Sequence, residues 1–355
     1  MTTQLGVETP LDDRGRAPAS PVVTWLKSRG AWILILDLAL IAFFSLISRG
    51  NVFWSVANAQ SLLLSVSQIL LLALGLAMML GAGIFDLSLG ANLVLSSVVG
   101  ALVMRSFQQT AGDTTSYHDI PLAILAGLVA CVVVGAAFGA VNGVIIAIGN
   151  INSLVATLAT LGIGTGIALL ITGGSDVAGL PADLQISIGL NTVLGIPIPA
   201  LASILIAVCL WVVVRFMRYG MRTQAIGSSR TSAERAGIRV RAHLIGLAVL
   251  GGALAGLAGF IDLSRFGSTA LAGHANDALA AVTAAVIGGT LLEGGRISIT
   301  GTVWGAFLAV ILQIGLVIIG VSAFWQLIVV GAVLLIAVLL DRVSVVRRSR
   351  SVRGP

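Results

Sequence analysis

Asp86 has the most unusual setting of any ionisable residue in the sequence, because it follows a glycine-rich break within a long apolar stretch. Residues 81–92 read GAGIFDLSLGAN, and Gly81 and Gly83 are expected to end a helix there. A carboxylate at this point can accept hydrogen bonds from the free amide groups of the next helix. It can also belong to a polar break that lines a water-filled path. Both interpretations can hold together.

Other polar side chains lie within or beside apolar stretches, where each could bond a neighbouring helix or line a wet path for a neutral polyol. With Asp86, these candidates are Ser88, Asn92, Asn142, Asn152, Ser153, Thr157, Gln313 and Gln326. Asp37 is the second acid expected at depth, and we expect it to point into the helix bundle or towards the inner headgroups. Two isolated acids do not favour an ion-coupled carrier, which usually needs acids in relays.

The sequence lacks the patterns of ATP hydrolysis and of covalent catalysis. Lys27 is the only lysine and no glycines precede it, so a phosphate-binding loop of the G-x-x-x-x-G-K-[ST] type is missing. No G-x-S-x-G motif occurs. The three histidines are far apart, and Cys131 and Cys209 lie in apolar stretches that are typical of buried thiols. We expect no catalysis, cofactor or metal site in this chain.

The composition indicates a protein that spans a membrane several times. Hydrophobic residues make up 57% of the chain and charged residues 10%, against about 25% charged in a soluble domain. Crossing a hydrocarbon core takes about 20 residues of helix. We therefore expect an all-α fold with about ten transmembrane helices, at 31–48, 60–80, 84–104, 121–148, 152–172, 198–217, 243–262, 277–292, 298–318 and 323–341. The eighth is short enough to be tilted, re-entrant or buried against its neighbours.

The basic residues orient these spans. With ten crossings and a cytoplasmic N-terminus, the basic residues fall on one side except for three, namely Arg49, Arg105 and Arg265. Positive charge is retained in the cytoplasm during insertion. We therefore expect the chain to span the cell (plasma) membrane with both termini in the cytoplasm. The net charge of +6 then follows from the orientation of the chain among membrane lipids and does not indicate a nucleic-acid partner. The expected organisation is a disordered tail over 1–30, a transmembrane domain over 31–341 with a cytoplasmic loop at 218–242, and a basic tail over 342–355.

Five segments, in order, resemble one family: the membrane permeases of ribose-, xylose- and autoinducer-2-type ABC importers, within the branched-chain amino acid permease superfamily. The first, GAGIFDLSLGA, is similar to a family segment but has Phe85 between Ile84 and Asp86. The others are 142–174, 225–240, 277–308 and 320–341. The resemblance implies a fold similar to that of the vitamin B12 importers. It also implies a second permease subunit, an extracytoplasmic sugar-binding protein, and a cytoplasmic ABC ATPase that holds the ATP and magnesium.

The same resemblance makes the loop at 218–242 a candidate for coupling to the ATPase. Ser229 is a candidate N-cap, Gly237 is a natural stop, and the residues proposed for coupling are Ser232, Ala233, Glu234, Arg235, Ala236 and Gly237. Glu234 would accept from basic groups of the ATPase, and Ala233 and Ala236 would allow close approach. The alternative is a basic loop held by anionic lipid.

Two other classes of function compete with an importer permease. One is a self-sufficient channel or ion-coupled carrier, and the other is a membrane-embedded enzyme. Genes for an ATPase and a secreted binding protein next to this one would favour the importer.

Overall fold

The computed structural model describes residues 29–111, 114–274, 276–322, 324–326, 328–329, 331–332 and 335. The expected N-terminal tail, apart from its last two residues, lies outside the described residues. So do the C-terminal tail and most of the tenth expected span.

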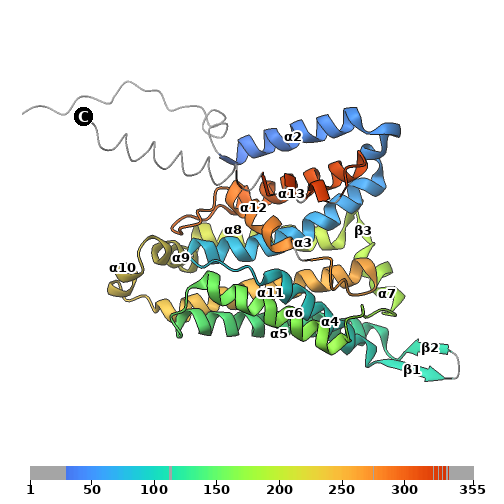
Figure 1. The fold of residues 1–355 in the computed structure, drawn as a ribbon, viewed down its shortest axis with the longest axis horizontal. Helices are drawn as coiled ribbons and strands as arrows, with labels where there is room; N and C mark the ends of the chain where they lie inside the picture. The colour runs from blue at the N-terminus through green and yellow to red at the C-terminus, as the bar shows by residue number, and fades with distance from the viewer. Residues whose placement is uncertain are drawn as a thin grey trace, which may run out of the picture.

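Long helices dominate the described part of the chain, and most of them run roughly parallel (Figure 1). Seven are long and apolar enough to cross a membrane: α2 (Arg29–Ile47), α3 (Val56–Gly81), α5 (Ile120–Ala147), α6 (Ser153–Thr172), α8 (Ile198–Phe216), α11 (Val240–Phe266) and α13 (Ile299–Ile318). Two shorter apolar helices, α4 (Leu89–Arg105) and α12 (Asp277–Ile287), lie among them. Each of the first nine expected spans therefore has a helix in its place.

Short elements connect these helices at the two ends of the molecule. They are η1 (Arg49–Trp54), β1 (Gln108–Ala111), β2 (Thr114–Tyr117), α7 (Ala182–Leu184), η2 (Gln185–Gly189), β3 (Thr192–Val193), β4 (Ile196–Pro197), α9 (Arg218–Ser228) and α10 (Arg230–Arg235). The strands pair as two antiparallel hairpins, with Gln108 opposite Tyr117 and Thr192 opposite Pro197. Helices α9 and α10 lie at one end, here called the α10 end, and the β1–β2 hairpin lies at the other, the hairpin end (Figure 1).

Two expected spans differ from the helices observed. The third begins at Leu89 rather than residue 84, because residues 82–88 are not helical. The eighth ends at Ile287 rather than residue 292, because the backbone turns at Gly288 and Gly289, where φ is +93° at Gly289. With a rise of 1.5 Å per residue, the 11 residues of α12 span only about 16 Å, roughly half of a hydrocarbon core.

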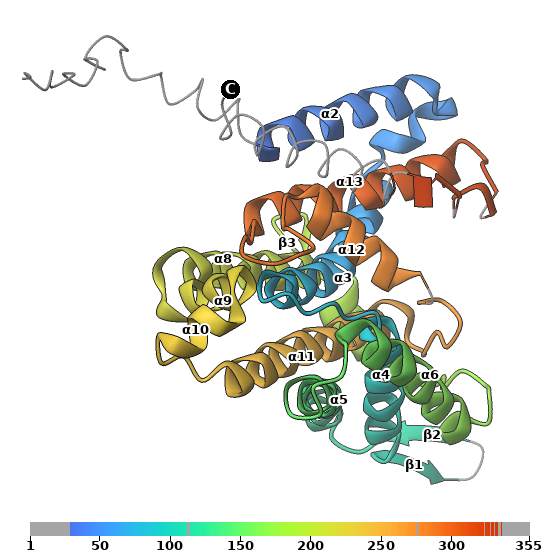
Figure 2. The same ribbon diagram turned by 60° about the vertical axis from the view of Figure 1, so that its left-hand side comes forward.

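Helix α11 is the central element, and it packs against α5, α3 and α4. Helices α2 and α13 lie on one side of the molecule and α4, α5 and α6 on the other (Figure 2). A seam of small residues joins α5 to α11. A Cβ atom at Gly135 or Gly139 of α5 would clash with the α11 backbone. The helices therefore approach closely enough for backbone contact, as in small-residue seams of membrane helices.

The described arginines segregate between the two ends as expected. Arg105 ends α4 and Arg265 lies in the last turn of α11, both at the hairpin end. The α10 end carries Arg215, Arg218, Arg222, Arg230, Arg235, Arg239 and Arg241. Asp37 on α2 is 2% exposed, as expected for an acid that points into the bundle.

Candidate functional site

The break between α3 and α4 is formed by a glycine turn followed by an extended segment. Helix α3 ends at Gly81, and Gly83 adopts a φ of +75°. The amide of Gly83 donates to the Leu80 carbonyl at 2.8 Å, and that of Ile84 to the Met79 carbonyl at 3.0 Å. These two bonds are the Schellman pattern that closes helices with a left-handed glycine. The local sequence therefore sets where the break begins.

Side chains alternate in burial along residues 82–88. Ala82, Ile84, Asp86 and Ser88 are buried, whereas Gly83, Phe85 and Leu87 are partly exposed. Successive side chains of an extended segment point to opposite faces, so Asp86 and Ser88 turn into the protein together with Ile84, and Phe85 and Leu87 turn out. Asp86 and Ser88 are among the candidates predicted from the sequence, whereas Phe85 and Leu87 are not. The period-2 burial is visible only once the segment is known to be extended.

Asp86 and Ser88 form a buried network with α5. The Asp86 carboxylate accepts from the Ser88 amide at 2.8 Å and from the Ser88 hydroxyl at 2.6 Å. The side-chain amide of Asn142 donates to the Ser88 hydroxyl oxygen at 2.7 Å. Asp86 thus accepts hydrogen bonds from Ser88 at the start of the next helix, which is one of the two interpretations drawn from the sequence.

The first turn of α6 holds the break from another direction. The Phe85 amide donates to the Ser153 hydroxyl at 3.1 Å, and the Thr157 hydroxyl lies 3.4 Å from the Phe85 carbonyl oxygen. Asn152 caps α6 by accepting from the Leu154 amide at 2.9 Å. Five of the nine candidates therefore converge on residues 82–88: Asp86, Ser88, Asn142, Ser153 and Thr157.

A second candidate element, α10, lies at the opposite end from the hairpins (Figure 1). The Ser229 hydroxyl caps it by accepting from the Ser232 amide at 3.3 Å, and Gly237 ends it with a φ of +80°. This confirms the short helix expected in the loop. Ser232, Glu234, Arg235, Ala236 and Gly237 are exposed. Ala233 is only 3% exposed and packs against its own fold, so its expected role in close approach to a partner is wrong.

Comparison with known proteins identifies the class to which this arrangement belongs. Residues 58–338 match the family described as branched-chain amino acid transport system / permease component. The chain belongs to this family. Its members are transport permeases rather than enzymes, which confirms the expected absence of catalysis.

Curated relatives of this permease include sugar importer components. The chain is 39% identical to the ribose import permease protein RbsC of Bacillus subtilis, over 80% of this chain and 84% of that protein. It is 32% identical to the D-allose transport system permease protein AlsC of Escherichia coli, over 92% and 95%. It is 29% identical to the galactose/methyl galactoside import permease protein MglC of Salmonella typhimurium, over 92% and 97%. No solved structure matches the chain.

The remaining candidates lie elsewhere in the permease. Asn92 donates to the carbonyls of Gly135 at 3.1 Å and Gly252 at 3.4 Å, so it fastens the α5–α11 seam to α4. Gln313 is exposed on α13, and Gln326 donates to the Val321 carbonyl at 3.0 Å. Helix α13, which carries Gln313, lies on the other side of the molecule from α4, α5 and α6 (Figure 2).

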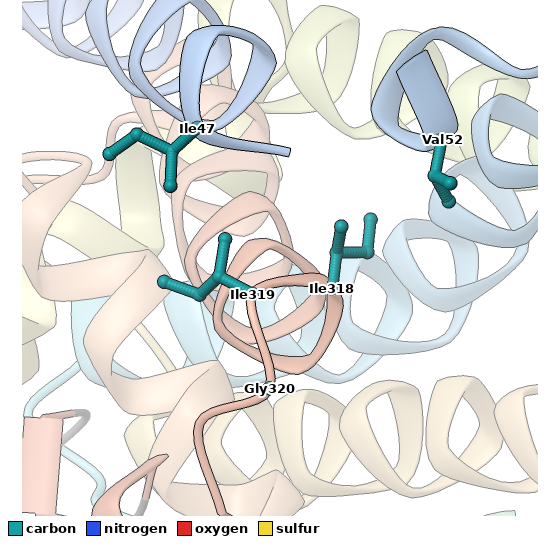
Figure 3. A pocket seen from close by; sticks show the side chains of 5 residues that line it. All are labelled: Ile47, Val52, Ile318, Ile319 and Gly320. Atoms are coloured by element: carbon teal, nitrogen blue, oxygen red, sulfur yellow. The ribbon is translucent and has the colours of Figure 1, made fainter. Parts of the chain in front are cut away.

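Two surface hollows of the permease differ in chemistry. One of about 580 Å³ is lined by Ile47, Val52, Ile318, Ile319 and Gly320, with aliphatic side chains pointing towards it (Figure 3). This lining offers no side-chain hydrogen bonds to a polyol. The other, of about 640 Å³, lies at the hairpin end and includes polar residues such as Arg105, Gln108, Tyr117 and Asp183.

Proposed function

We propose that this chain is the membrane-spanning subunit of an ABC importer that passes a monosaccharide or similar polar solute into the cytoplasm. The ribose, allose and galactose permeases among its relatives carry this proposal. A separate ATPase, which binds the ATP and magnesium, supplies the energy, and an extracytoplasmic binding protein delivers the sugar. A second permease subunit, identical or different, completes the pathway.

The arginines at the α10 end support the orientation. If that end is cytoplasmic, both termini are cytoplasmic and the hairpin end faces the binding protein. If α4 makes one crossing, α12 with the turn and loop after it makes another, and a tenth helix forms at 323–341, the chain spans the membrane ten times. The fold would then be the vitamin B12-importer type that the family resemblance implies.

In this proposal α10 docks into the ATPase. A short capped helix can pass on a rigid-body movement, and the exposed Glu234 and Ala236 offer an acceptor and a place for close approach. The alternative occupant is anionic lipid, which exposed arginines would attract by about 1 kcal/mol each.

The break at 82–88 is proposed to border the solute pathway. The candidates that converge there act by holding its backbone, and Phe85 and Leu87 present its exposed face. An aromatic ring suits a sugar pathway, because it offers contact area without binding hydroxyl groups tightly. Asn92, Asn152, Gln313 and Gln326 remain candidates on other surfaces.

Reconstitution in liposomes tests the function. The chain with its ATPase and binding protein should take up one sugar from a panel of ribose, allose and galactose in an ATP-dependent manner. The chain alone, given only an ion gradient, should accumulate none. Accumulation by the chain alone would identify an ion-coupled carrier and would overturn the proposal.

A further inference from the structure

A buried cluster of charged and polar side chains joins three helices near the hairpin end. His274, in the loop between α11 and α12, places its Nε2 atom 3.0 Å from Asp262 and its Nδ1 atom 2.8 Å from Asp277. The Gln68 side-chain nitrogen on α3 lies 2.9 Å from both His274 Nδ1 and Asp277 Oδ2. We call these four residues the His274 clamp.

The geometry fixes the charge state of the imidazole ring. Both ring nitrogens of His274 face carboxylate oxygens, and an ionised carboxylate can only accept hydrogen bonds. With both carboxylates ionised, the ring donates from both nitrogens, which only the imidazolium form does, and the Gln68 amide then donates to Asp277 alone. The imidazole ring is 7% exposed and Asp262 is fully buried, so these charge-assisted bonds are shielded from water.

A fourth charge balances the cluster. Arg265, one turn beyond Asp262 on α11, donates to the hydroxyls of Ser65 at 2.9 Å and Ser61 at 3.2 Å on α3. Ser61, Ser65 and Gln68 are spaced four and three residues apart, so they form a polar stripe on one face of α3. Two carboxylates, one imidazolium and one guanidinium make a neutral set that ties the end of α11 to α3.

The loop that carries His274 is also tied to the hairpin-end surface. The Thr269 hydroxyl donates to Asp176 at 3.2 Å, and the Leu271 amide donates to the same carboxylate oxygen at 2.8 Å. The loop beyond Asp176 is tied in turn to the β1–β2 hairpin, because Gln108 donates to the Gly179 carbonyl at 2.8 Å. These hydrogen bonds join the surface loops to Leu271, three residues before His274 in the same loop.

A short helix, α12, follows the loop that carries His274. It is 11 residues long, and glycine turns at Gly267 and Gly289, with φ of +66° and +93°, bound the segment that contains it. The His274 clamp holds the start of this helix against α3 and α11.

We propose that His274 is a positioning residue, an ionic clamp through which a partner that engages the hairpin-end loops moves α12 relative to α3 and α11. This rests on the proposed function for the identity of that partner, the sugar-binding protein. In this proposal the clamp sets how strongly the binding protein controls ATP hydrolysis by the ATPase.

Spin-label distances in the purified full chain test the clamp without any partner. Labels at Leu279→Cys on α12 and Val133→Cys on α5, both exposed, are introduced with Cys209→Ser; Cys131 is fully buried and stays unlabelled. We expect one narrow distance distribution in the parent and a broadened or second distribution in His274→Gln. Because removing one partner of a buried ion pair can unfold a protein, the triple variant Asp262→Asn/His274→Gln/Asp277→Asn is measured beside it; it removes the three charges of the His274 clamp together and keeps Arg265 on its two serines. His118→Gln, an exposed histidine after β2, is the matched control and should leave the distance unchanged.

ATP hydrolysis by the assembled importer provides the second readout. In the triple variant, the ratio of rates with and without binding protein should fall at least about fivefold, the lower range of typical allosteric coupling. An unchanged distance distribution and ratio, with only a lower melting temperature, would make the network structural and overturn the clamp. Failure of the parent importer to take up sugar would instead refute the proposed function. The spin-label result does not depend on that function, because it is measured without any partner.

Discussion

The side-chain amide of Asn142 donates to the Ser88 hydroxyl oxygen at 2.7 Å, so helix α5 holds the non-helical segment between α3 and α4. Ser88 in turn donates twice to Asp86. The break is thereby supported by a chain of hydrogen bonds in the protein interior, where an unpaired polar group is costly.

Replacement of Asp86 separates hydrogen bonding from charge. Asp86→Asn keeps an oxygen that can accept from Ser88 and should leave the melting temperature nearly unchanged. Asp86→Ala leaves the Ser88 amide and hydroxyl without this acceptor and should cost about 1–3 kcal/mol. Melting in detergent measures both. If Asp86→Asn folds normally and yet abolishes uptake, the negative charge itself acts in transport.

Truncation of Phe85 should affect sugar uptake, whereas truncation of its buried neighbour Ile84 should affect stability. Phe85→Ala removes a partly exposed ring and should change the KM for sugar uptake with little loss of stability. Ile84→Ala empties a buried site and should cost about 2–5 kcal/mol. Uptake kinetics and melting curves distinguish them. Normal uptake by Phe85→Ala would remove the break from the pathway.

Tryptophan at Ala236 tests docking of α10. Ala236→Trp keeps every arginine, so attraction to lipid should persist while close approach of an ATPase is blocked, and ATP-dependent uptake should fall. Ala137→Trp, at an exposed alanine of α5 between the two ends, is the matched control. A cysteine at Ala236, but not at the buried Ala233, should crosslink to the ATPase. Undiminished uptake together with no crosslink would refute docking.

The α5–α11 seam should not tolerate a larger side chain. A Cβ at Gly139 would meet the Ala248 carbonyl and the Gly252 Cα, so Gly139→Leu should destabilise the fold by about 1–3 kcal/mol or more. Gly166 on α6 has open space around it, and Gly166→Leu should be nearly neutral. Membrane abundance and melting temperature measure the difference. Equal stability of the two variants would contradict the close seam.

The His274 clamp should lose its stabilising effect at high pH. His274 lies in the loop between the spans; burial lowers the pKa of its imidazole, but hydrogen bonds to Asp262 and Asp277, with their charges, outweigh this and raise the pKa from 6.5 to about 10. A pKa raised on folding stabilises the protein fully below pH 6.5, and this stabilisation is lost as the pH rises through about 10. Melting temperature should therefore fall more steeply with rising pH in the parent than in His274→Gln. Parallel pH profiles would contradict the charged form.

The sequence alone determined the membrane character, the place of nine helices and the turn at Gly83. These follow from apolar run length, glycine conformation and charge asymmetry, which are local properties. The short helix α10 was likewise predictable, because Ser229 and Gly237 cap it locally. The tenth expected span lies mostly outside the described residues.

Only the tertiary structure decided which side chains meet. Gln68 lies 206 residues from His274 in the sequence, and no spacing rule joins it to His274 or Asp262; the three converge because α3, α11 and the loop before α12 pack together. The inward turn of Asp86 and the outward turn of Phe85 were equally hidden, because a one-residue shift in an extended segment exchanges its two faces. Burial of Ala233 depends on the neighbouring helices, and no pattern in the six residues of α10 itself can specify it.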